Sequence, residues 1–533
     1  MHPPSAPSAS PRHANFASQR IGAGRSGVVF KGECAQGFPI ARKVFDSGPL
    51  TKLVQYLFLG APNPYAWNQS SVQCALLRRR ILTPMVRHWF GDKLRVASAK
   101  SFDWNSQFRA FQLDTEFVRG GSPLLHHPMN RRGSREVEDL VHYVMAPLQG
   151  LLRESGFDGL VWQAGLGNPV ALANFLKVEG TDRFSRWAWI DLESGVPALF
   201  PCNPMELLRF YLPASWKYRR PLFDDVDTNR LTSYLSENEA ALISSVGEEA
   251  LEAIRRDVAE LEFHQHEWKS QPRAARGIRY QEAKGRLSAE HARYFLAHPW
   301  QWYLREASRV PPAVIALTIK ASRKLGDWVA HIPWIKLALA TVQLLISSKY
   351  RWSVAQKFVA KRIDSWERRK QLLPGEANRL RSQLGQEESC AYLTDFAVHI
   401  AIKPFVKVLE YFVFGALLYG SGVIDEGTFA LVVLLGGCLA RTLYTLMRMC
   451  QAAVRGHELP WVALITGVFP VIGNLAYPLQ IVYSSTEEDD VLAQFILYDG
   501  CSTIGRRMPI WGGYDTLTEH AFNHLPDRVV TRT

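Results

Sequence analysis

The stretch ANFASQRIGAGRSGVVFKGECAQGFPIARKVF, residues 14–45, contains the pattern that decides the fold. Its residues 22–27 have the spacing G-x-G-x-x-G, and the residues that follow, 28–32, are V-V-F-K-G. In a dinucleotide-binding unit a helix begins after the third glycine. Here β-branched and aromatic residues follow it, and these favour a strand that ends in a turn. Residues 38–45 predict a second strand, which carries Lys43 near its end.

The composition is that of a folded protein with several domains. With 533 residues the chain is too long for one hydrophobic core, so two to four domains are expected. Hydrophobic residues make up 47% of the chain, and they are concentrated late in it. The formal net charge is +12, but the basic residues are spread out and form no recognisable nucleic-acid module, so no nucleic acid is expected as a partner. Basic residues close to a lipid bilayer explain this charge better.

The cysteines and the first residues bear on the compartment. The seven cysteines are scattered and form no C-x-x-C pair, which argues against a disulfide framework or a zinc site and suits a reducing compartment. Residues 1–15 form a Pro/Ser-rich segment, predicted to be a disordered tail, without the apolar core of a secretory signal. We therefore expect the first folded domain to lie in the cytoplasm.

A helix and then two strands are predicted downstream of Lys43. The helix lies within residues 63–90, has apolar residues at helical spacing, and is expected to end or kink at Pro84. Residues 101–118 predict two short strands, after which a Gly-Gly turn follows. Residues 136–156 predict a long amphipathic helix, because apolar residues recur there at intervals of three and four.

Two polar residues further along are candidates for a metal site. Asn174 lies in the loop that follows the amphipathic helix, and Asp191 ends an apolar run that predicts a strand. Mg²⁺ prefers carboxylate and amide oxygens together with water, so these two side chains could form half of its ligand shell. Glu193 is a candidate second acidic ligand, and Asp158 is interpreted as a turn residue.

Taken together, these patterns from about residue 16 to 245 resemble the protein-kinase-like superfamily, and they are nearer to its atypical bacterial branches than to typical Ser/Thr kinases. The resemblance rests on the glycine-rich turn between two strands, the lysine one strand later, the segment 116–123 and the asparagine–aspartate pair. It implies a bilobal α+β domain, with an N-lobe at about residues 16–120 and a helical C-lobe at about 121–245. ATP and Mg²⁺ would bind between the lobes.

The resemblance assigns nine residues to a nucleotide site: Gly22, Gly24, Gly27, Val29, Lys43, Glu116, Val118, Asn174 and Asp191. It implies that the glycines cover the phosphates, where a Cβ would clash, and that Lys43 contacts the α- and β-phosphates. Backbone groups at residues 116–118 would bind the adenine edge. Asn174 and Asp191 would hold the metal ion.

The sequence departs from the family pattern at two places, and this leaves three hypotheses open. The helix at 63–90 has no glutamate to pair with Lys43, and Gln73 is the nearest substitute. Pro169 stands where the family has its catalytic-base aspartate. The chain is therefore expected to be an ATP-dependent phosphotransferase without a recognisable base, acting on a protein or other acceptor, or a pseudokinase that regulates or scaffolds a membrane partner. In the third hypothesis the chain is a membrane protein whose C-terminal spans carry the function, and the front domain is a sensor.

The rest of the chain predicts helices and a membrane region. Residues 246–403 are expected to be a helical linker and juxtamembrane region. Residues 404–483 contain three apolar stretches, 405–424, 428–447 and 459–483, each of about 20 residues or more, the length that crosses a bilayer. We therefore expect an α-helical transmembrane region there, followed by a C-terminal tail at 484–533.

Together these segments give the expected fold class: a bilobal α+β kinase-like domain, helical segments and a C-terminal α-helical transmembrane region. The expected location is a bilayer, the bacterial inner membrane, with the front domain in the cytoplasm because basic residues flank the first stretch. Arg441 within the second stretch is expected to snorkel or to face protein, and Pro470 and Pro478 make the third stretch irregular.

Overall fold

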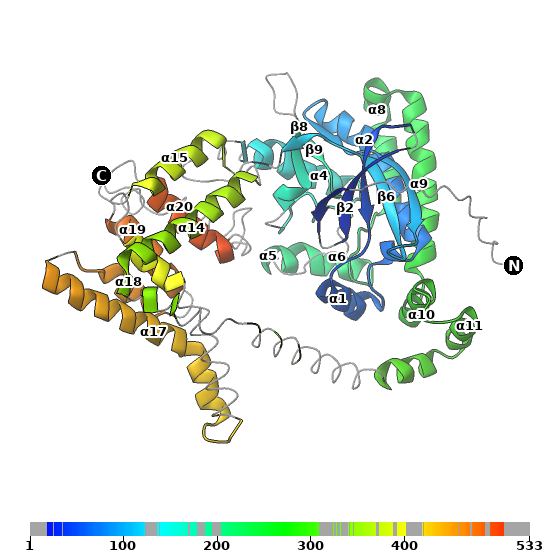
Figure 1. The fold of residues 1–533 in the computed structure, drawn as a ribbon. Coiled ribbons are helices and arrows are strands. Elements are labelled where there is room, and N and C mark those ends of the chain that lie inside the picture. The colour runs from blue at the N-terminus through cyan, green and yellow to red at the C-terminus, as the bar shows by residue number, and fades with distance from the viewer. Residues whose placement is uncertain are drawn as a thin grey trace.

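We describe a computed structural model of the chain. Apart from single-residue gaps and a few isolated positions, it describes residues 19–121, 136–168, 171–178, 187–193, 204–308, 342–368, 372–386, 392–400, 420–469, 472–484 and 491–505. The predicted tail at 1–15, most of the apolar stretch at 405–424 and the end of the predicted C-terminal tail lie outside the described residues. The described part is α+β, as predicted, and it forms two bodies with separate cores (Figure 1).

The front body begins with an antiparallel sheet of five strands. In spatial order these are β1 (Gln19–Ala23), β2 (Val28–Glu33), β3 (Pro39–Val44), β6 (Ala110–Glu116) and β5 (Ala99–Asn105). The strands predicted on both sides of the glycine pattern and within 101–118 are therefore confirmed. Lys43 lies opposite Val29 on one neighbouring strand and opposite Leu113 on the other, which places it in the middle of the sheet.

A second, smaller sheet brings three distant segments together. Its strands, in order, are β4 (Leu94–Val96), β9 (Trp187–Trp189), β8 (Phe175–Val178) and β7 (Gly120–Gly121). A Cβ on Gly120 would lie 2.3 Å from the Lys177 carbonyl oxygen, so β7 can pair this closely with β8 only because the residue is glycine. The residues that follow β6 therefore lie beside the end of β8, and the start of β8 lies beside the end of β9.

Helix α2 (Gln69–Phe90) packs against the first sheet, β4 and the long helix α9 (Glu248–Lys269) (Figure 1). The Asn68 side chain accepts a hydrogen bond from the Ser71 amide at 2.8 Å and so caps the helix start. Pro84 was expected to end or kink this helix; the helix does not end there but continues to Phe90. Its buried face, which includes Leu77, Ile81 and Met85, secures it by tertiary packing.

Most of the remaining helical elements of the front body contribute to its main core, and residues between 274 and 302 form a separate small cluster. These elements are α1 (Pro49–Leu59), η1 (Pro64–Ala66), η2 (Val141–Met145), α4 (Ala146–Glu154), η3 (Ala171–Asn174), α5 (Pro204–Glu206), η4 (Leu207–Tyr211), α6 (Leu212–Lys217), α7 (Thr228–Glu237), α8 (Glu239–Val246), α10 (Arg273–Ala283) and α11 (Ala289–Ala297). The helix predicted at 136–156 corresponds to η2 and α4. Buried residues up to Tyr280 belong to the same core. The front core thus continues beyond residue 245, where the sequence placed the end of this domain.

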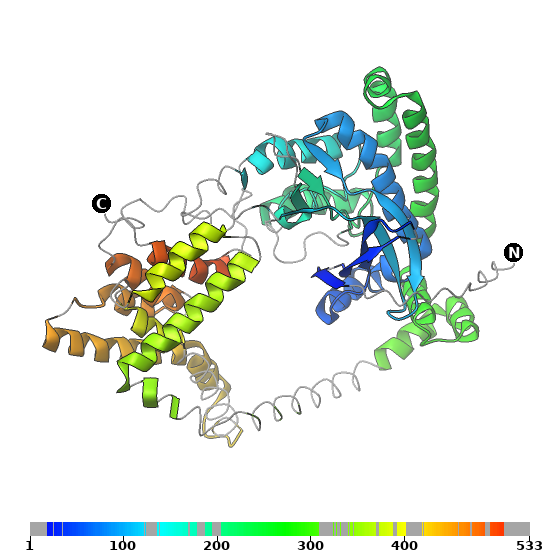
Figure 2. The ribbon, with the colours of Figure 1, turned by 45° about the horizontal axis from the view of Figure 1, so that its top comes forward.

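The C-terminal body is helical and has its own core (Figure 2). It contains α14 (Ser348–Arg368), α15 (Pro374–Gly385), α17 (Glu426–Arg455), α18 (Trp461–Gly467), η6 (Ile472–Leu475), α19 (Ala476–Ser484) and α20 (Val491–Gly505). Arg362 on α14 donates to both carboxylate oxygens of Asp499 on α20, at 2.8 and 2.5 Å. Trp366 donates to the same carboxylate at 2.9 Å. This group ties the two helices together.

The predicted transmembrane region was wrong as a description of this fold. Among the residues that the structure describes, no helix combines the length and the apolar character needed to cross a bilayer. The third stretch, 459–483, forms three short elements, α18, η6 and α19, and α19 is buried in the helical core. The second stretch lies in α17, where the buried Arg441 interrupts the apolar run. An apolar run in the sequence can be core-forming helix as well as a span, and α19 is of the first kind.

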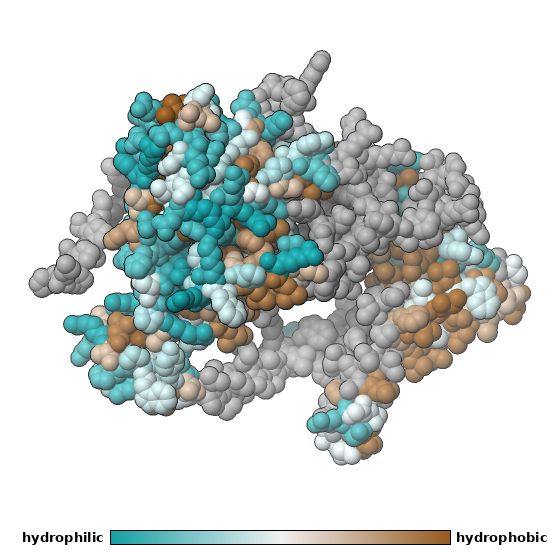
Figure 3. Space-filling model, turned by 180° about the vertical axis from the view of Figure 1, so that it is seen from behind, coloured by the Kyte–Doolittle hydropathy of each residue, from teal (hydrophilic) through white to brown (hydrophobic). Residues whose placement is uncertain are grey.

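Apolar side chains nevertheless gather on the surface of the C-terminal body (Figure 3). Large apolar residues of α17 and α18 are exposed, among them Leu439, Leu443 and Ile465. In the front body the view shows more hydrophilic surface between its apolar patches (Figure 3).

Candidate functional site

One cavity of about 450 Å³ lies between the two sheets of the front body. All nine residues that the sequence assigned to a nucleotide site line it: Gly22, Gly24, Gly27, Val29, Lys43, Glu116, Val118, Asn174 and Asp191. They come from β1, β2 and the turn between them, from β3, from the end of β6 and the residues just after it, from η3 and from the residues after β9. The structure therefore brings together segments that are up to about 170 residues apart in the sequence.

The glycine-rich turn closes one side of this cavity. The Gly24 amide donates to the Gly27 carbonyl oxygen at 2.8 Å, and the Asn63 side chain donates to the Ser26 carbonyl oxygen at 3.2 Å. A Cβ on Gly27 would lie 2.1 Å from the Val44 carbonyl oxygen, whereas a Cβ on Gly24 would meet nothing within 4 Å. Gly27 is therefore required by packing against β3, which the sequence argument from phosphates did not foresee. Gly22 and Gly24 leave the backbone open toward the cavity.

Lys43 is buried and faces two carboxylates. Its Nζ lies 2.6 Å from Asp191 Oδ1 and 3.4 Å from Glu193 Oε2, and it donates to the Glu193 carbonyl oxygen at 3.3 Å. Burial by itself would lower the pKa of the lysine, but the charges of Asp191 and Glu193 outweigh burial and raise the pKa above its ordinary value. Lys43 is thus a fixed positive charge at the wall of the cavity.

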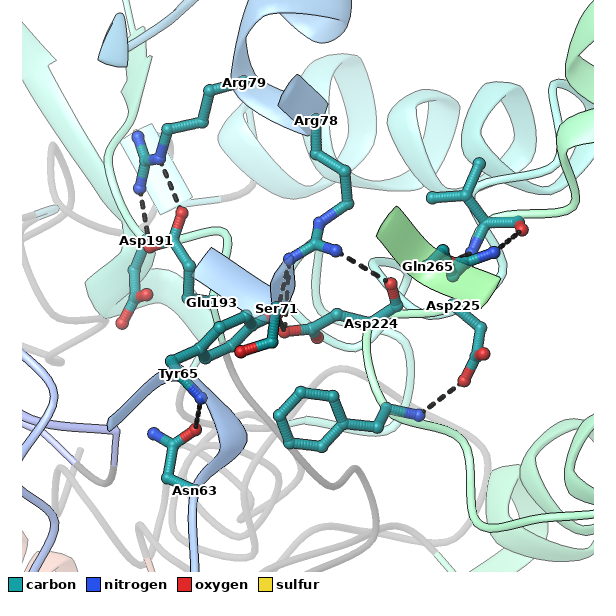
Figure 4. Close-up of polar contacts among 12 residues, drawn as sticks. Asn63, Tyr65, Ser71, Arg78, Arg79, Asp191, Glu193, Asp224, Asp225 and Gln265 are labelled. Carbon is teal, nitrogen blue, oxygen red and sulfur yellow. Dashed lines mark hydrogen bonds and ion pairs between the residues drawn. The ribbon is translucent and has the colours of Figure 1, made fainter. Parts of the chain in front are cut away.

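Glu193 is held by an arginine from helix α2 (Figure 4). Arg79 donates from Nε to one carboxylate oxygen of Glu193 at 2.6 Å and from a terminal nitrogen to the other at 2.9 Å. It also donates to the Ala97 and Ile190 carbonyl oxygens, at 2.7 and 2.8 Å. Both charged side chains are only 1% exposed. Burial would raise the pKa of Glu193, but the charge of Arg79 prevails and lowers it to about 2.

Two sequence predictions about the neighbourhood of Lys43 need correction. Gln73 does not take the place of a glutamate beside the lysine, because its amide donates to Glu260 at 2.7 Å on the exposed side of α2. Glu193, proposed as a second metal ligand, is committed to Arg79 and does not line the cavity. The signal for this arrangement was the arginine run in a helix that lacks glutamate, together with an acid two residues after Asp191.

Asn174 and Asp191 present oxygen atoms to the cavity. The Asn174 amide nitrogen donates to the backbone and side-chain oxygens of Gln163, at 3.0 and 2.8 Å, so its orientation is set and its carbonyl oxygen is the atom left for a cation. The Asp191 side chain is 33% exposed. Within the described ranges no group of three or more His, Cys, Asp or Glu side chains could hold a metal by itself. The two oxygen donors fit Mg²⁺ that takes its other ligands from water and phosphate.

No carboxylate in the loop before Asn174 faces the cavity among the described residues. Asp158, interpreted from sequence as a turn residue, is buried in a structural group: it pairs with Arg230 and accepts a hydrogen bond from Tyr218 at 2.9 Å. Gln163 and Asn168 line the cavity instead. Pro169 lies outside the described residues.

The other end of the cavity is apolar. Its lining there comes from Val29, Ala41, Ala97, Leu176 and Ile190. The segment 116–118 runs along this end, and no backbone hydrogen bond is found for Phe117 or Val118 within the described part of the chain. The Glu116 carboxylate is paired with Arg95, so only backbone groups of this segment are free to meet a flat polar ligand.

Comparisons with protein-family models, with curated proteins and with solved structures found no match for this chain.

Proposed function

We propose that the front body is a kinase-like domain that binds ATP with Mg²⁺ in the cavity between its two sheets. The observation that carries this proposal is the convergence of Lys43 and Asp191, 148 residues apart, at 2.6 Å on the wall of a cavity that a glycine-rich turn closes. Such an arrangement is typical of protein kinases, in which a glycine-rich loop, a strand lysine and an aspartate surround the phosphates. Along the sequence the glycine-rich turn, the lysine and the aspartate follow one another in the order that this pattern has.

The two ends of the cavity suit the two ends of the nucleotide. The apolar end, with Val29, Ala41 and Leu176, would hold the purine ring, and the free backbone groups of Val118 would bind its edge. At the polar end Lys43 would contact phosphate oxygens as a point charge. Asn174 and Asp191 would hold Mg²⁺, which when bound neutralises the phosphate charge.

We further propose that transfer of the γ-phosphate, where it occurs, is slow. Phosphoryl transfer depends mostly on positioning and charge stabilisation, which Lys43 and the Asn174–Asp191 pair supply. A general base contributes roughly 10²–10⁴ in rate. Within the described lining of the cavity the carboxylates are Asp191 and Glu116, and Glu116 is tied to Arg95.

That last observation favours a second candidate function, a pseudokinase that binds nucleotide and regulates a partner without turnover. Both candidates require the same ATP site, and they differ only in the chemical step. Pro169, which stands where the family has its base aspartate, supports the second candidate, whereas the Asn174–Asp191 pair supports the first.

Thermal unfolding of the full chain with ATP or ADP, each with and without Mg²⁺, tests both candidates. We expect Mg²⁺-dependent stabilisation by ATP that is lost in Lys43→Met and in Asp191→Ala. Arg42→Met is the matched control, because Arg42 neighbours Lys43 on β3 but pairs with Asp114, and neither residue lines the cavity. Release or transfer of labelled γ-phosphate then separates a slow enzyme from a pseudokinase. No stabilisation of the wild-type chain would contradict the proposed function.

A further inference from the structure

Lys43 has two carboxylate partners that differ in their surroundings. Asp191 lines the cavity, and its side chain is 33% exposed. Glu193 lies behind the cavity wall, and its side chain is 1% exposed. Only Asp191 is therefore placed to meet a ligand, while Glu193 faces the lysine from the protein side.

The position of Glu193 is fixed by Arg79. The arginine forms a two-bond fork with the carboxylate and two further hydrogen bonds to the Ala97 and Ile190 carbonyl oxygens. It thereby joins helix α2 to the segment before β5 and to the residues after β9. Forked arginine–carboxylate pairs are geometrically specific, and here both partners are buried. Glu193 cannot rotate away without leaving a buried guanidinium unpaired.

This difference matters when a ligand arrives. A cation bound at Asp191 competes with Lys43 for the negative charge of that carboxylate and so weakens the 2.6 Å contact between the two side chains. The lysine then keeps its place in the cavity only if its second partner holds it. Glu193 offers both its carboxylate and its carbonyl oxygen to Nζ, at 3.4 and 3.3 Å.

We propose that Glu193, locked by Arg79, is the positioning residue for Lys43, so that helix α2 contributes a cation to this network where a helix glutamate was expected. This inference rests on the proposed function, because the phosphates of ATP are what Lys43 would be positioned for. It also implies that the lysine site is assembled without movement of α2, since every group of the network is already in contact.

The first test measures binding of ATP·Mg²⁺ and of adenosine to the full chain. Glu193→Gln alone leaves Arg79 unpaired and can impair folding, so the main variant is Arg79→Gln combined with Glu193→Gln, which removes both charges. The control is Arg42→Gln with Asp114→Asn, another forked pair beside Lys43; unlike Arg79, neither of its residues lines the cavity. We expect the main variant to bind ATP·Mg²⁺ at least tenfold more weakly and adenosine within twofold of wild type. The control should change neither affinity.

Equal weakening for ATP·Mg²⁺ and adenosine would mean a purely structural role and overturn the inference, as would unchanged affinity for both. A second measurement needs no nucleotide: urea unfolding of Lys43→Met and Glu193→Gln, singly and together, in the Arg79→Gln background. Non-additive midpoints support the Lys43–Glu193 contact, and additive midpoints contradict it. If the wild-type chain bound no ATP while the variants gave non-additive unfolding midpoints, the proposed function would be refuted and the Lys43–Glu193 contact would still be supported.

Discussion

Buried charged side chains occur in both bodies of this protein, but they lie beside a cavity in one and link two helices in the other. In the front body Lys43 and Arg79, which line the cavity, converge on Glu193 behind its wall, and one further carboxylate, Asp191, faces into the cavity. In the C-terminal body Arg362 and Asp499 tie one helix to another. An ion pair with a buried carboxylate therefore does not by itself mark a functional site. What marks the front group is that two carboxylates share one lysine and only one of them can be reached from the cavity.

The two bodies also use apolar residues differently. The front core is continuous and contains both sheets and α2. The C-terminal body buries α19, yet it leaves Leu439 of α17 63% exposed. Total hydrophobicity along the chain reports neither difference, because it does not distinguish a core-facing side chain from an exposed one.

Removing Arg79 should have the largest effect of the changes that compare the two bodies. Arg79→Met leaves the Glu193 carboxylate buried without its main partner, and breaking such a pair typically costs about 3–5 kcal/mol. Arg362→Met removes a fork whose arginine side chain is 34% exposed, so solvent screening should keep its cost to about 1–2 kcal/mol. Equilibrium urea unfolding of the full chain measures both. A larger loss for Arg362→Met would reverse the comparison.

Ile481 and Leu439 separate the buried from the exposed part of the apolar C-terminal sequence. Ile481 is 1% exposed, so Ile481→Ala should destabilise the C-terminal body by about 2–5 kcal/mol. Leu439→Ala, at an exposed position, should stay within about 0.5 kcal/mol of wild type. Unfolding midpoints in urea report both values. Similar losses at the two positions would show that α19 is not packed in the helical core as described.

Two glycines of the front turn should respond differently to the same added methyl group. Gly27→Ala places a Cβ 2.1 Å from a backbone oxygen and should cost about 1–3 kcal/mol through overpacking. Gly24→Ala meets open space and should be nearly neutral in thermal unfolding. If Gly24→Ala proved the more destabilising change, the described packing of the turn on β3 would be incorrect.

The smallest predicted effect is a pH dependence of stability that arises from Lys269 in the front body. Burial lowers the pKa of Lys269, beside Asp225, to about 8, below the value near 10.4 of an unfolded lysine. Between these values the unfolded chain binds more protons, so Lys269 should make stability rise with pH by about 1 kcal/mol per unit from pH 8 to 10. Lys269→Met should lack this slope. Arg362 stays charged in this window, since its hydrogen bond to Asp499 raises its pKa further.

A wild-type slope equal to that of Lys269→Met, or of opposite sign, would contradict this prediction. The measurement is urea unfolding at half-unit steps of pH. Subtracting the slope of Lys269→Met from that of the wild-type chain removes the contributions of the other titrating groups, because both chains contain them.

The sequence predicted the parts of the site that are encoded locally. Strand patterns around the glycines fixed the turn, and Lys43 and Asp191 each lie at the end of a strand-like run, so their placement followed from the expected order of strands. The Arg79–Glu193 pair could not be predicted this way, because its partners are 114 residues apart and neither stands where a family pattern has its charge. The packing role of Gly27 likewise depends on the approach of β3.

The C-terminal prediction was wrong for a related reason. Residues 459–483 have the composition of a span, but the chain divides them into three short elements. Helix α18 ends at Gly467 and α19 begins at Ala476, and α19 packs mainly against its neighbours α18 and α20. Apolar length alone did not contain that information.

Hydrogen exchange of the full chain with and without ATP·Mg²⁺ tests the central claim most directly, because it locates binding in one body or the other. We predict slower exchange in residues 19–44, 116–121 and 187–193, which surround the cavity, and no change in α14 of the C-terminal body. Slower exchange confined to the C-terminal body, or no change in any of the three front segments at saturating ATP·Mg²⁺, would contradict the account.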